Sequence, residues 1–303
     1  LDSRLQQPIE RRGDQLLLLP KVDWIIDDKN TLSVVYNRMR WDSPGGVQTQ
    51  AVIFRGTNSF GSDFVDIDTL NARWNSTISS NVLNEFRFQF ARELNQQTGQ
   101  TPGPGEPTTA PDGGVPDIGI TGGGFDIGRP NFLPRNQYPL EKNFQFSNST
   151  TMLVGNHTLK FGGDISRVND VIDNLFQSGG EYRYNNLQDF LTDFADPAQK
   201  RYNFFSQAFG SSVAEFSTTD FSLFVQDDIR ITPRFTLNVG LRWEYQKLPE
   251  PQRANPLEPR TASFPSDKNN FGPRIGAAYD ITGKGKTSIR GGYGIYYGRV
   301  INS

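Results

Sequence analysis

The chain has 303 residues, no cysteine, one histidine and a formal net charge of -2. This composition excludes a disulfide framework and a cysteine-ligated metal, and the near-neutral charge gives no support for a nucleic-acid partner. The longest unbroken aliphatic run, 16–19, is far shorter than the ~18 apolar residues that a transmembrane helix needs. Because 12% of the residues are aromatic and the chain holds 30 Gly and 19 Pro, the composition favours many short strands.

Polar turn signals follow one another along the chain at alternately short and long intervals. Tight turns are expected between strand-like runs at 27–30, 79–82, 155–157, 232–234 and 282–285. Long connections, which hold most of the Pro, Gly and Asn, are expected at about 42–65, 95–140, 168–218 and 249–270. Short turns at one end and long loops at the other predict an up-and-down antiparallel sheet of about ten strands in five hairpins.

Four segments in the last third of the chain alternate between apolar and polar residues, as strands with two different faces do. They cover 221–231, 235–245, 271–281 and 288–297. The apolar set includes Leu237, Val239, Leu241, Trp243, Tyr279 and Tyr297. The polar set includes Gln226, Asp228, Arg230, Arg242, Glu244, Arg274 and Arg290. Asp227 is an exception, because its position falls on the apolar face.

Two architectures fit a sheet of this kind. In a soluble β-sandwich the apolar face packs on a second sheet, and strands average ~5 to 6 residues. In an outer-membrane barrel the strands need ~9 to 11 residues, the apolar face meets lipid and the polar face lines the lumen. The length of the alternating segments favours an all-β, antiparallel transmembrane barrel, with the polar set toward the lumen and the apolar set toward lipid.

Two segments carry a helical spacing. Phe86, Phe88 and Phe90 alternate with polar residues as in a strand, although 83–94 also fits one face of a helix. In 187–194, four apolar residues recur at helical spacing, which predicts a short helix inside a long loop. We interpret this helix as pinning its loop to the barrel rim.

Several strings in the second half resemble a known family. They are FVQDDIRITPRFTLNVGLRWEY (224–245), NFGPRIGAAYD (270–280) and GKTSIRGGYGIYYGR (285–299). Together they resemble the barrel of TonB-dependent outer-membrane receptors, especially the Oar-like group. GNHTLKFGGD (155–164) and LQDFLTDF (187–194) resemble two further landmarks of that group, in the same order. The resemblance covers about 155–299. The first half of the chain shares with the family only the alternation of short turns and long connections.

The resemblance implies a bacterial outer-membrane protein that contacts lipid. Barrels of such transporters have 22 strands around a plug, so 1–303 corresponds to one partial barrel domain from the middle of a receptor. No plug domain, TonB box or signal peptide is visible, and we expect either a processed start or a piece of a longer protein. In this setting the inward-facing Gly272, Gly276, Gly292 and Gly294 would leave room for a plug. The polar column at Gln226, Asp228 and Arg230, beside Arg242 and Glu244, is interpreted as ion pairs that stabilise the wall.

Two motifs are set aside. DITGKGKT (280–287) is similar to a phosphate-binding loop but lacks its first Gly and runs into a strand. Asp63, Asp66 and Asp68 lack the Gly and Glu of a calcium loop and are interpreted as part of a solvated loop. No catalytic, cofactor or metal site is predicted.

The leading functional hypothesis is a receptor that imports a scarce nutrient. Its outer loops would capture a small-molecule, sugar or peptide ligand, and the TonB system would act through a plug domain outside this chain. The loop at 95–140 is expected to be too rich in Pro and Gly to build a core. The alternatives are a complete ten-stranded barrel hydrolase, which the position of His157 in a short turn opposes, and a secreted β-sandwich binding module.

Overall fold

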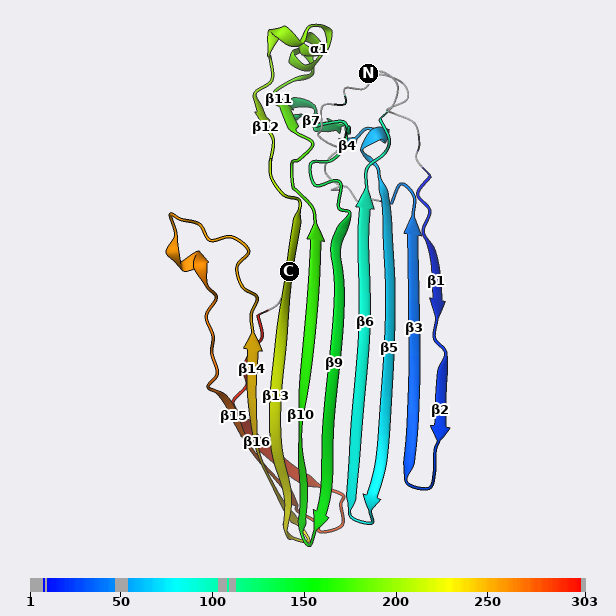
Figure 1. Ribbon diagram of the computed structural model, residues 1–303, viewed down its shortest axis with the longest axis vertical. Helices are drawn as coiled ribbons and strands as arrows, with labels where there is room; N and C mark the ends of the chain where they lie inside the picture. The colour runs from blue at the N-terminus through cyan, green and yellow to red at the C-terminus, as the bar shows by residue number, and fades with distance from the viewer. Residues whose placement is uncertain (1–7, 9, 47–53, 103–107, 109–112, 301–303) are drawn as a thin grey trace.

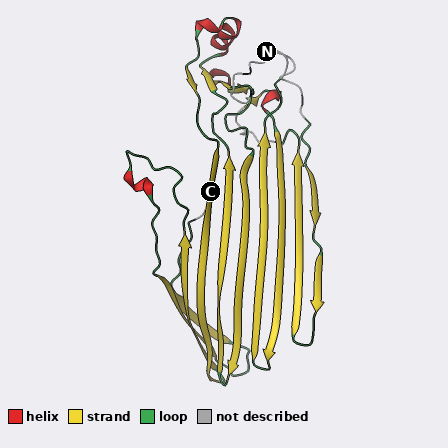
Figure 2. Ribbon diagram, viewed as in Figure 1, coloured by secondary structure: helices red, strands yellow, loops and turns green. Residues whose placement is uncertain are grey.

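The computed structural model describes residues 8, 10–46, 54–102, 108 and 113–300. Its main feature is one large antiparallel sheet of long strands (Figures 1 and 2), in the order β1-β3-β5-β6-β9-β10-β13-β14-β15-β16, with β2 also pairing with β3. The strands are β1 Asp14–Leu18, β2 Lys21–Ile25, β3 Asn30–Ser43, β5 Ser62–Ser79, β6 Val82–Thr98, β9 Gln137–Val154, β10 His157–Asp173, β13 Val213–Thr232, β14 Phe235–Lys247, β15 Asn270–Asp280 and β16 Ser288–Gly294.

Strands β1 and β2 together occupy one position in this sheet. Leu18 lies opposite Arg38 and Lys21 opposite Val35, so both strands pair with β3. Pro20 lies between them and has no N–H to donate, which interrupts the ladder while its carbonyl still accepts from the Tyr36 N–H at 3.0 Å. Counted in this way, the sheet has the predicted ten strand positions, and all five predicted tight turns join neighbouring strands.

The strands are longer than the sequence patterns indicate. β9 has 18 residues and β13 has 20, so both continue well past the alternating segments. The connections accordingly shrink to 44–61, 99–136, 174–212 and 248–269, which corrects the wider bounds expected for the first three. Residues 83–94 belong to β6, so the strand interpretation of that segment is confirmed and the helical alternative is wrong.

A second, smaller sheet is built from three of the long connections. Its order is β12-β11-β7-β8-β4. In Figure 1 it stands at the end of the long strands and does not cover either face of the large sheet. The β-sandwich alternative, which requires two sheets packed face to face, is therefore wrong. The strands are β4 Phe54–Arg55, β7 Asp117–Ile120, β8 Phe125–Ile127, β11 Glu181–Tyr184 and β12 Phe204–Ser206.

This smaller sheet carries the apolar core of the described chain. The buried hydrophobic residues are Val115, Ile120, Ile127, Leu133, Tyr184 and Phe190, and all of them lie in the long connections. The expectation that 95–140 is too rich in Pro and Gly to build a core is therefore wrong. Two separate connections supply these residues, four from 99–136 and two from 174–212, and the core forms only when the connections meet.

One α-helix, α1 Leu187–Ala195, confirms the predicted helix. The Asn186 side chain caps its N-terminus by accepting from the Asp189 N–H at 2.9 Å. Phe190 is buried against Tyr184 of β11, with the rings 5.5 Å apart. The helix thus packs on the smaller sheet, at its far end in Figure 1, and not on the rim of the large sheet as expected. Short 3-10 helices cover η2 Thr57–Ser59, η3 Thr121–Gly123, η4 Pro197–Gln199 and η5 Pro259–Ala262.

The large sheet is open in the described residues. β16 pairs with β15, and β1 and β2 pair with β3, but the two outer positions do not pair with each other. In Figure 1, β15 and β16 turn behind the other strands, so the sheet is strongly curved at that side. None of the helices in the described ranges is long and apolar enough to cross a membrane.

Candidate functional site

The large sheet has two chemically different faces. Residues opposite one another on neighbouring strands share a face. Leu223, Trp243 and Phe271 lie opposite one another in turn on β13, β14 and β15. In the same way Asp228 lies opposite Asn238, and Asn238 opposite Gly276. We call the first set the apolar face and the second the polar face.

The structure places most of the predicted residues on these two faces. Tyr297 lies beyond the end of β16, so it has no strand face, and its hydroxyl donates to the Phe271 carbonyl at 3.3 Å. On the apolar face lie Leu237, Val239, Leu241, Trp243 and Tyr279. On the polar face lie Gln226, Asp228, Arg230, Arg242, Glu244, Arg274 and Arg290.

The apolar face is uncovered. Leu223 is 60% exposed and Ile275 is 54% exposed. Aromatic pairs continue this face onto earlier strands, with the Phe88 and Phe146 rings 5.0 Å apart. In a soluble protein such a broad exposed apolar surface would be covered by a partner or would aggregate.

The predicted exception on this face, Asp227, has a partner. Its carboxylate lies 2.6 Å from Nδ1 of His157, the one histidine of the chain. His157 begins β10 directly after the short turn, so the pair lies near the short-turn end of the sheet. This contact gives one oxygen of the Asp227 carboxylate, Oδ2, a partner on the apolar face.

On the polar face, Arg242 is the centre of the wall's hydrogen bonds. Its Nη2 lies 3.2 Å from Asp164 of β10 and 2.8 Å from the Ser222 hydroxyl, and its Nε lies 2.9 Å from Glu244. The expected pairing of Arg242 with the Asp228 column is wrong, because Asp228 instead accepts from Asn238 at 2.6 Å. The partner that sequence reasoning missed is Asp164.

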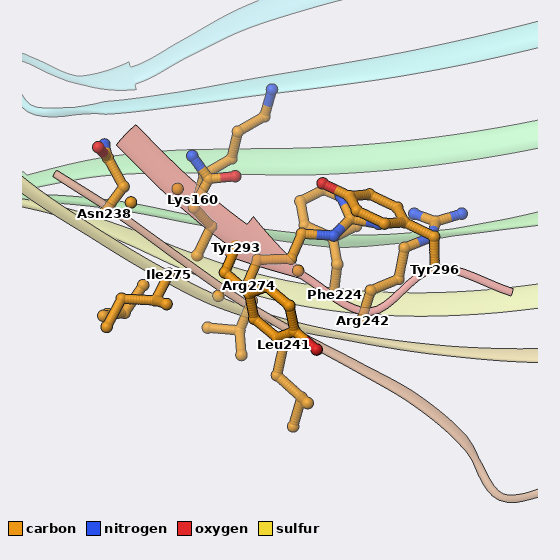
Figure 3. A pocket seen from close by; sticks show the side chains of 16 residues that line it. Lys160, Phe224, Asn238, Leu241, Arg242, Arg274, Ile275, Tyr293 and Tyr296 are labelled. Carbon is orange, nitrogen blue, oxygen red and sulfur yellow. The ribbon is translucent and has the colours of Figure 1, made fainter. Parts of the chain in front are cut away.

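A hollow of about 640 Å³ opens beside this network (Figure 3). In the figure Lys160, Asn238, Arg242 and Tyr296 rise on one side of the sheet, while Leu241 and Ile275 point to the other. Gly240, Gly276, Gly292 and Gly294 line it too. Because these glycines carry no side chain, they leave space on the polar face of the sheet, and Lys160 and Arg274 lie beside that space.

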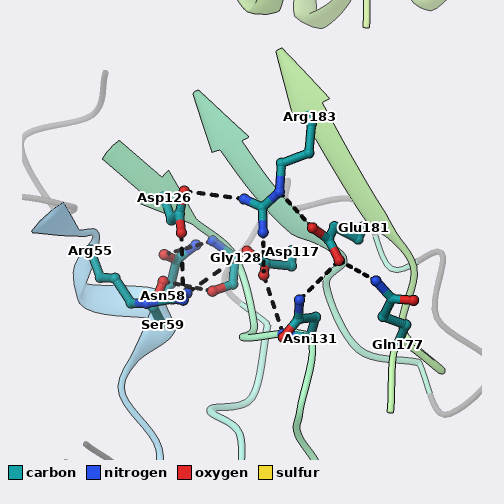
Figure 4. A network of polar contacts seen from close by, with 10 residues as sticks. All are labelled: Arg55, Asn58, Ser59, Asp117, Asp126, Gly128, Asn131, Gln177, Glu181 and Arg183. Atoms are coloured by element: carbon teal, nitrogen blue, oxygen red, sulfur yellow. Dashed lines mark hydrogen bonds and ion pairs between the residues drawn. The ribbon is translucent and has the colours of Figure 1, made fainter. Parts of the chain in front are cut away.

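The second element of the site is the loop assembly, which we define as residues 54–61, 113–134 and 175–208. An ion-pair network joins its strands (Figure 4). Arg183 of β11 lies 2.5 Å from Glu181, 3.2 Å from Asp126 and 3.5 Å from Asp117. Arg55 of β4 reaches Asp126 at 3.5 Å and Asp117 at 3.8 Å. Four strands from three connections are therefore held by one set of charges.

Burial and charge act on these carboxylates in opposite directions. Burial raises the pKa of Asp117 to about 6, and the positive charges of Arg183 and Arg55 offset only part of that effect. At Glu181 burial also raises the pKa, but hydrogen bonds from Asn131 and Gln177 and the charge of Arg183 outweigh it, so the pKa is lowered. Asp117 is thus more easily protonated than Glu181.

Sequence reasoning missed this network, although a signal for it was present. Asp117 and Asp126 each begin the tripeptide Asp-Ile-Gly, in VPDIGITGGGFDIGRP. The two copies pair as β7 and β8, with Gly119 opposite Asp126. Gly119 leaves space that the Arg183 guanidinium fills, since a Cβ there would lie 1.6 Å from Arg183 Nη1.

The two motifs set aside from sequence have structural roles. Asp63, Asp66 and Asp68 lie on strand β5, so the solvated-loop interpretation is wrong; Asp66 and Asp68 both pair with Arg38 and Arg92. Asp280 stabilises the turn after β15 by accepting from the N–H groups of Gly283 and Gly285 at 3.0 and 2.8 Å. In the described ranges, no group of three His, Asp or Glu side chains is arranged to hold a metal ion.

The chain belongs to the outer membrane beta barrel domain family, whose model matches residues 5–303. No curated protein matches the chain. Among solved structures it is similar to the ferripyoverdine receptor of the outer membrane of Pseudomonas aeruginosa (13% identity, TM-score 0.54, covering 89% of this chain and 34% of that one). It is also similar to the siderophore receptor PiuA from Acinetobacter baumannii (14% identity, TM-score 0.51, covering 96% of this chain and 43% of that one). A third similar structure is the copper transporter OprC (12% identity, TM-score 0.51, covering 94% of this chain and 36% of that one).

These findings confirm the predicted fold and place the protein in the outer membrane. The chain covers 34% to 43% of the length of these three structures. At this level of identity the likeness is one of fold, and the similar proteins are receptors and a transporter.

Proposed function

We propose that the chain is part of the barrel of a TonB-dependent receptor that takes up a scarce nutrient, and that it is not an enzyme. The observation that supports this most strongly is the loop assembly. Three long connections fold into one packed unit, with its own core and ion pairs, at one end of a membrane-type sheet. Long connections that are ordered in this way usually serve binding.

In this proposal the apolar face meets lipid and the polar face lines the lumen. Strand length and exposure support the orientation, since the apolar residues are uncovered and β3, β5, β6, β9, β10, β13 and β14 all exceed the ~9 to 11 residues that span a bilayer. The hollow beside Arg242 then faces the lumen, where a plug domain pulled by the TonB system would pack against its glycines.

The loop assembly is the proposed capture surface for a small-molecule, sugar or peptide ligand. The similar structures include a ferripyoverdine receptor and a copper transporter, so both a metal chelate and a metal ion belong among the nutrients to be tested. The fold does not select one ligand class, because receptors for different ligands share the same barrel.

Excision of residues 100–131 from the full-length receptor tests this proposal. Gln97 and Arg135 already exchange backbone hydrogen bonds of 2.8 Å, so the shortened connection can close without disturbing β6 or β9. The deletion removes β7 and β8 from the centre of the smaller sheet. We expect the barrel to assemble, as judged by heat-modifiable electrophoretic mobility, and uptake to be lost.

The matched control is excision of 250–268, a connection outside the loop assembly. Uptake is measured as growth of the native bacterium, lacking its own copy, with a ferric siderophore, copper, an oligosaccharide or a peptide as the limiting nutrient. The control is expected to keep most of the growth that the intact receptor supports. Unchanged growth after loss of 100–131 would contradict the capture role.

A further inference from the structure

The apolar face ends at a defined level on each strand. The residues that β9 places on the apolar face run from Phe144 to Val154, and those that β13 places there run from Phe221 to Ile231. Each stretch corresponds to the ~9 to 11 residues that a transmembrane strand needs. Both strands continue beyond it toward the long connections, β9 back to Gln137 and β13 back to Val213.

The next residue on this face beyond the apolar stretch is a cation on five of the strands. Arg38, Asp68, Arg92 and Lys142 lie opposite one another in turn on β3, β5, β6 and β9. One step along, Arg167 lies opposite Thr219, and Thr219 opposite Lys247. We call Arg38, Arg92, Lys142, Arg167 and Lys247 the basic collar.

The cations of the collar are only partly neutralised. Arg38 lies 2.8 Å from Asp68 and 3.2 Å from Asp66, and Arg92 lies 3.2 Å from Asp66. These two arginines and two aspartates balance one another.

The other three cations of the collar lack such partners. Arg167 donates to the neutral side chains of Asn169 and Ser217, at 3.1 and 3.4 Å. In the described part of the chain, no ion pair joins Lys142, Arg167 or Lys247 to a carboxylate. The collar therefore carries a surplus of three positive charges.

We propose that the basic collar binds the phosphate groups of the phosphorylated glycolipid in the outer leaflet. The collar lies at the edge of the apolar stretch, where lipid headgroups meet the protein, on the side of the long connections. Lys and Arg beside a membrane surface attract anionic headgroups, and guanidinium and ammonium groups form charge-assisted hydrogen bonds with phosphate. The balanced Arg38 and Arg92 frame the site, and Lys142, Arg167 and Lys247 supply its free charge.

The proposal rests on the orientation of the faces given above. That orientation has its own test, which compares Val239→Arg on the apolar face with Asn238→Arg on the polar face. If those substitutions support the orientation and the collar binds no phosphate, only the collar proposal fails. If they reverse the orientation, the proposed function and the collar fail together.

The experiment is native mass spectrometry of the full-length receptor in detergent, titrated with bisphosphorylated lipid A or with its dephosphorylated form. The test variant combines Lys142→Gln, Arg167→Gln and Lys247→Gln. The control combines Lys21→Gln, Arg73→Gln and Arg87→Gln, which remove the same charge from the polar face. A charge-keeping variant, Lys142→Arg with Arg167→Lys and Lys247→Arg, separates charge from folding.

We expect the intact receptor to prefer the bisphosphorylated lipid. Each cation near a membrane surface is worth about a fivefold factor in affinity, so the test variant should lose this preference by about a hundredfold. The control and the charge-keeping variant should retain it. An intact receptor without preference, a test variant that binds like the intact receptor, or a control that loses as much would each overturn the proposal.

Discussion

The large sheet and the loop assembly are stabilised in different ways. The sheet exposes large apolar residues, such as Leu223 and Ile275, and is held by long hydrogen-bonded ladders. The loop assembly buries every fully buried hydrophobic residue of the described chain. In the proposed orientation the difference follows from the solvent, because lipid replaces a protein core around the barrel while the connections must fold by the rules that apply in water.

The ion pairs of the two regions also differ in how deeply they are buried. In the loop assembly Arg183 contacts carboxylates whose side chains are at most 11% exposed. On the polar face Arg242 contacts Asp164 and Glu244, which are 15% and 26% exposed. A buried network is costly to break, whereas a pair beside water is screened. The two arginines therefore offer a direct comparison of the two regions.

The largest effect is expected for Arg183→Met. The change leaves Glu181 buried without its cation and leaves Asp126 and Asp117 with Arg55 alone. Breaking a buried network in this way costs about 3 to 5 kcal/mol, which is enough to unfold the loop assembly alone. Limited proteolysis of the connections measures this. Arg242→Met is the matched control, expected to cost about 1 kcal/mol and to leave the barrel protease-resistant. Equal sensitivity of the two variants would remove the distinction between the regions.

The next effect compares one substitution in two solvents. Ile120 is 2% exposed in the loop assembly, so Ile120→Ala loses the transfer free energy and leaves a cavity, about 2 to 5 kcal/mol. Ile275→Ala on the apolar face should lose about 2 kcal/mol, the transfer part only, because lipid chains fill the gap. Hydrogen exchange of β7 and β8 reports the first change, and folding titrations into liposomes report the second. A larger cost at Ile275 would indicate protein packing on that face.

A smaller effect concerns pH. Since the folded-state pKa of Asp117, about 6, lies above its unfolded value, the folded form binds this proton more tightly. The contribution of Asp117 to stability is therefore present below about pH 4 and is lost as pH rises to about 6, on the order of 3 kcal/mol in all. Asp117→Asn should flatten this part of the pH dependence. Protection factors of the β7 amides, corrected for intrinsic exchange, measure it; an unchanged slope would contradict the role of Asp117.

The sequence predicted the sheet well because its signals are local. Strict alternation of two residue classes and the spacing of five tight turns are properties of neighbouring residues, and the strands pair with their neighbours in the chain. The loop assembly could not be predicted in the same way. Its strands have only two to four residues, and they pair across separate connections, as Glu181 does with Asp117.

The site residues follow the same division. The alternation assigned Arg242 and Arg274 to the polar face, because the period of two is sufficient for that. It could not find Asp164 as the partner of Arg242, since the choice of partner depends on the register between β10 and β13. Strand ends were also misjudged, because beyond the apolar stretch the outward residues become charged and the alternation disappears.

The central claim is that the apolar face meets lipid and the polar face lines the lumen. Val239→Arg and Asn238→Arg place the same charge on adjacent residues of β14, one on each face. Folding titrations of the full-length receptor into liposomes give both free energies. We predict a cost of about 2 to 4 kcal/mol for Val239→Arg near the bilayer midplane and a much smaller cost for Asn238→Arg. Equal costs, or a larger cost at Asn238, would contradict the orientation.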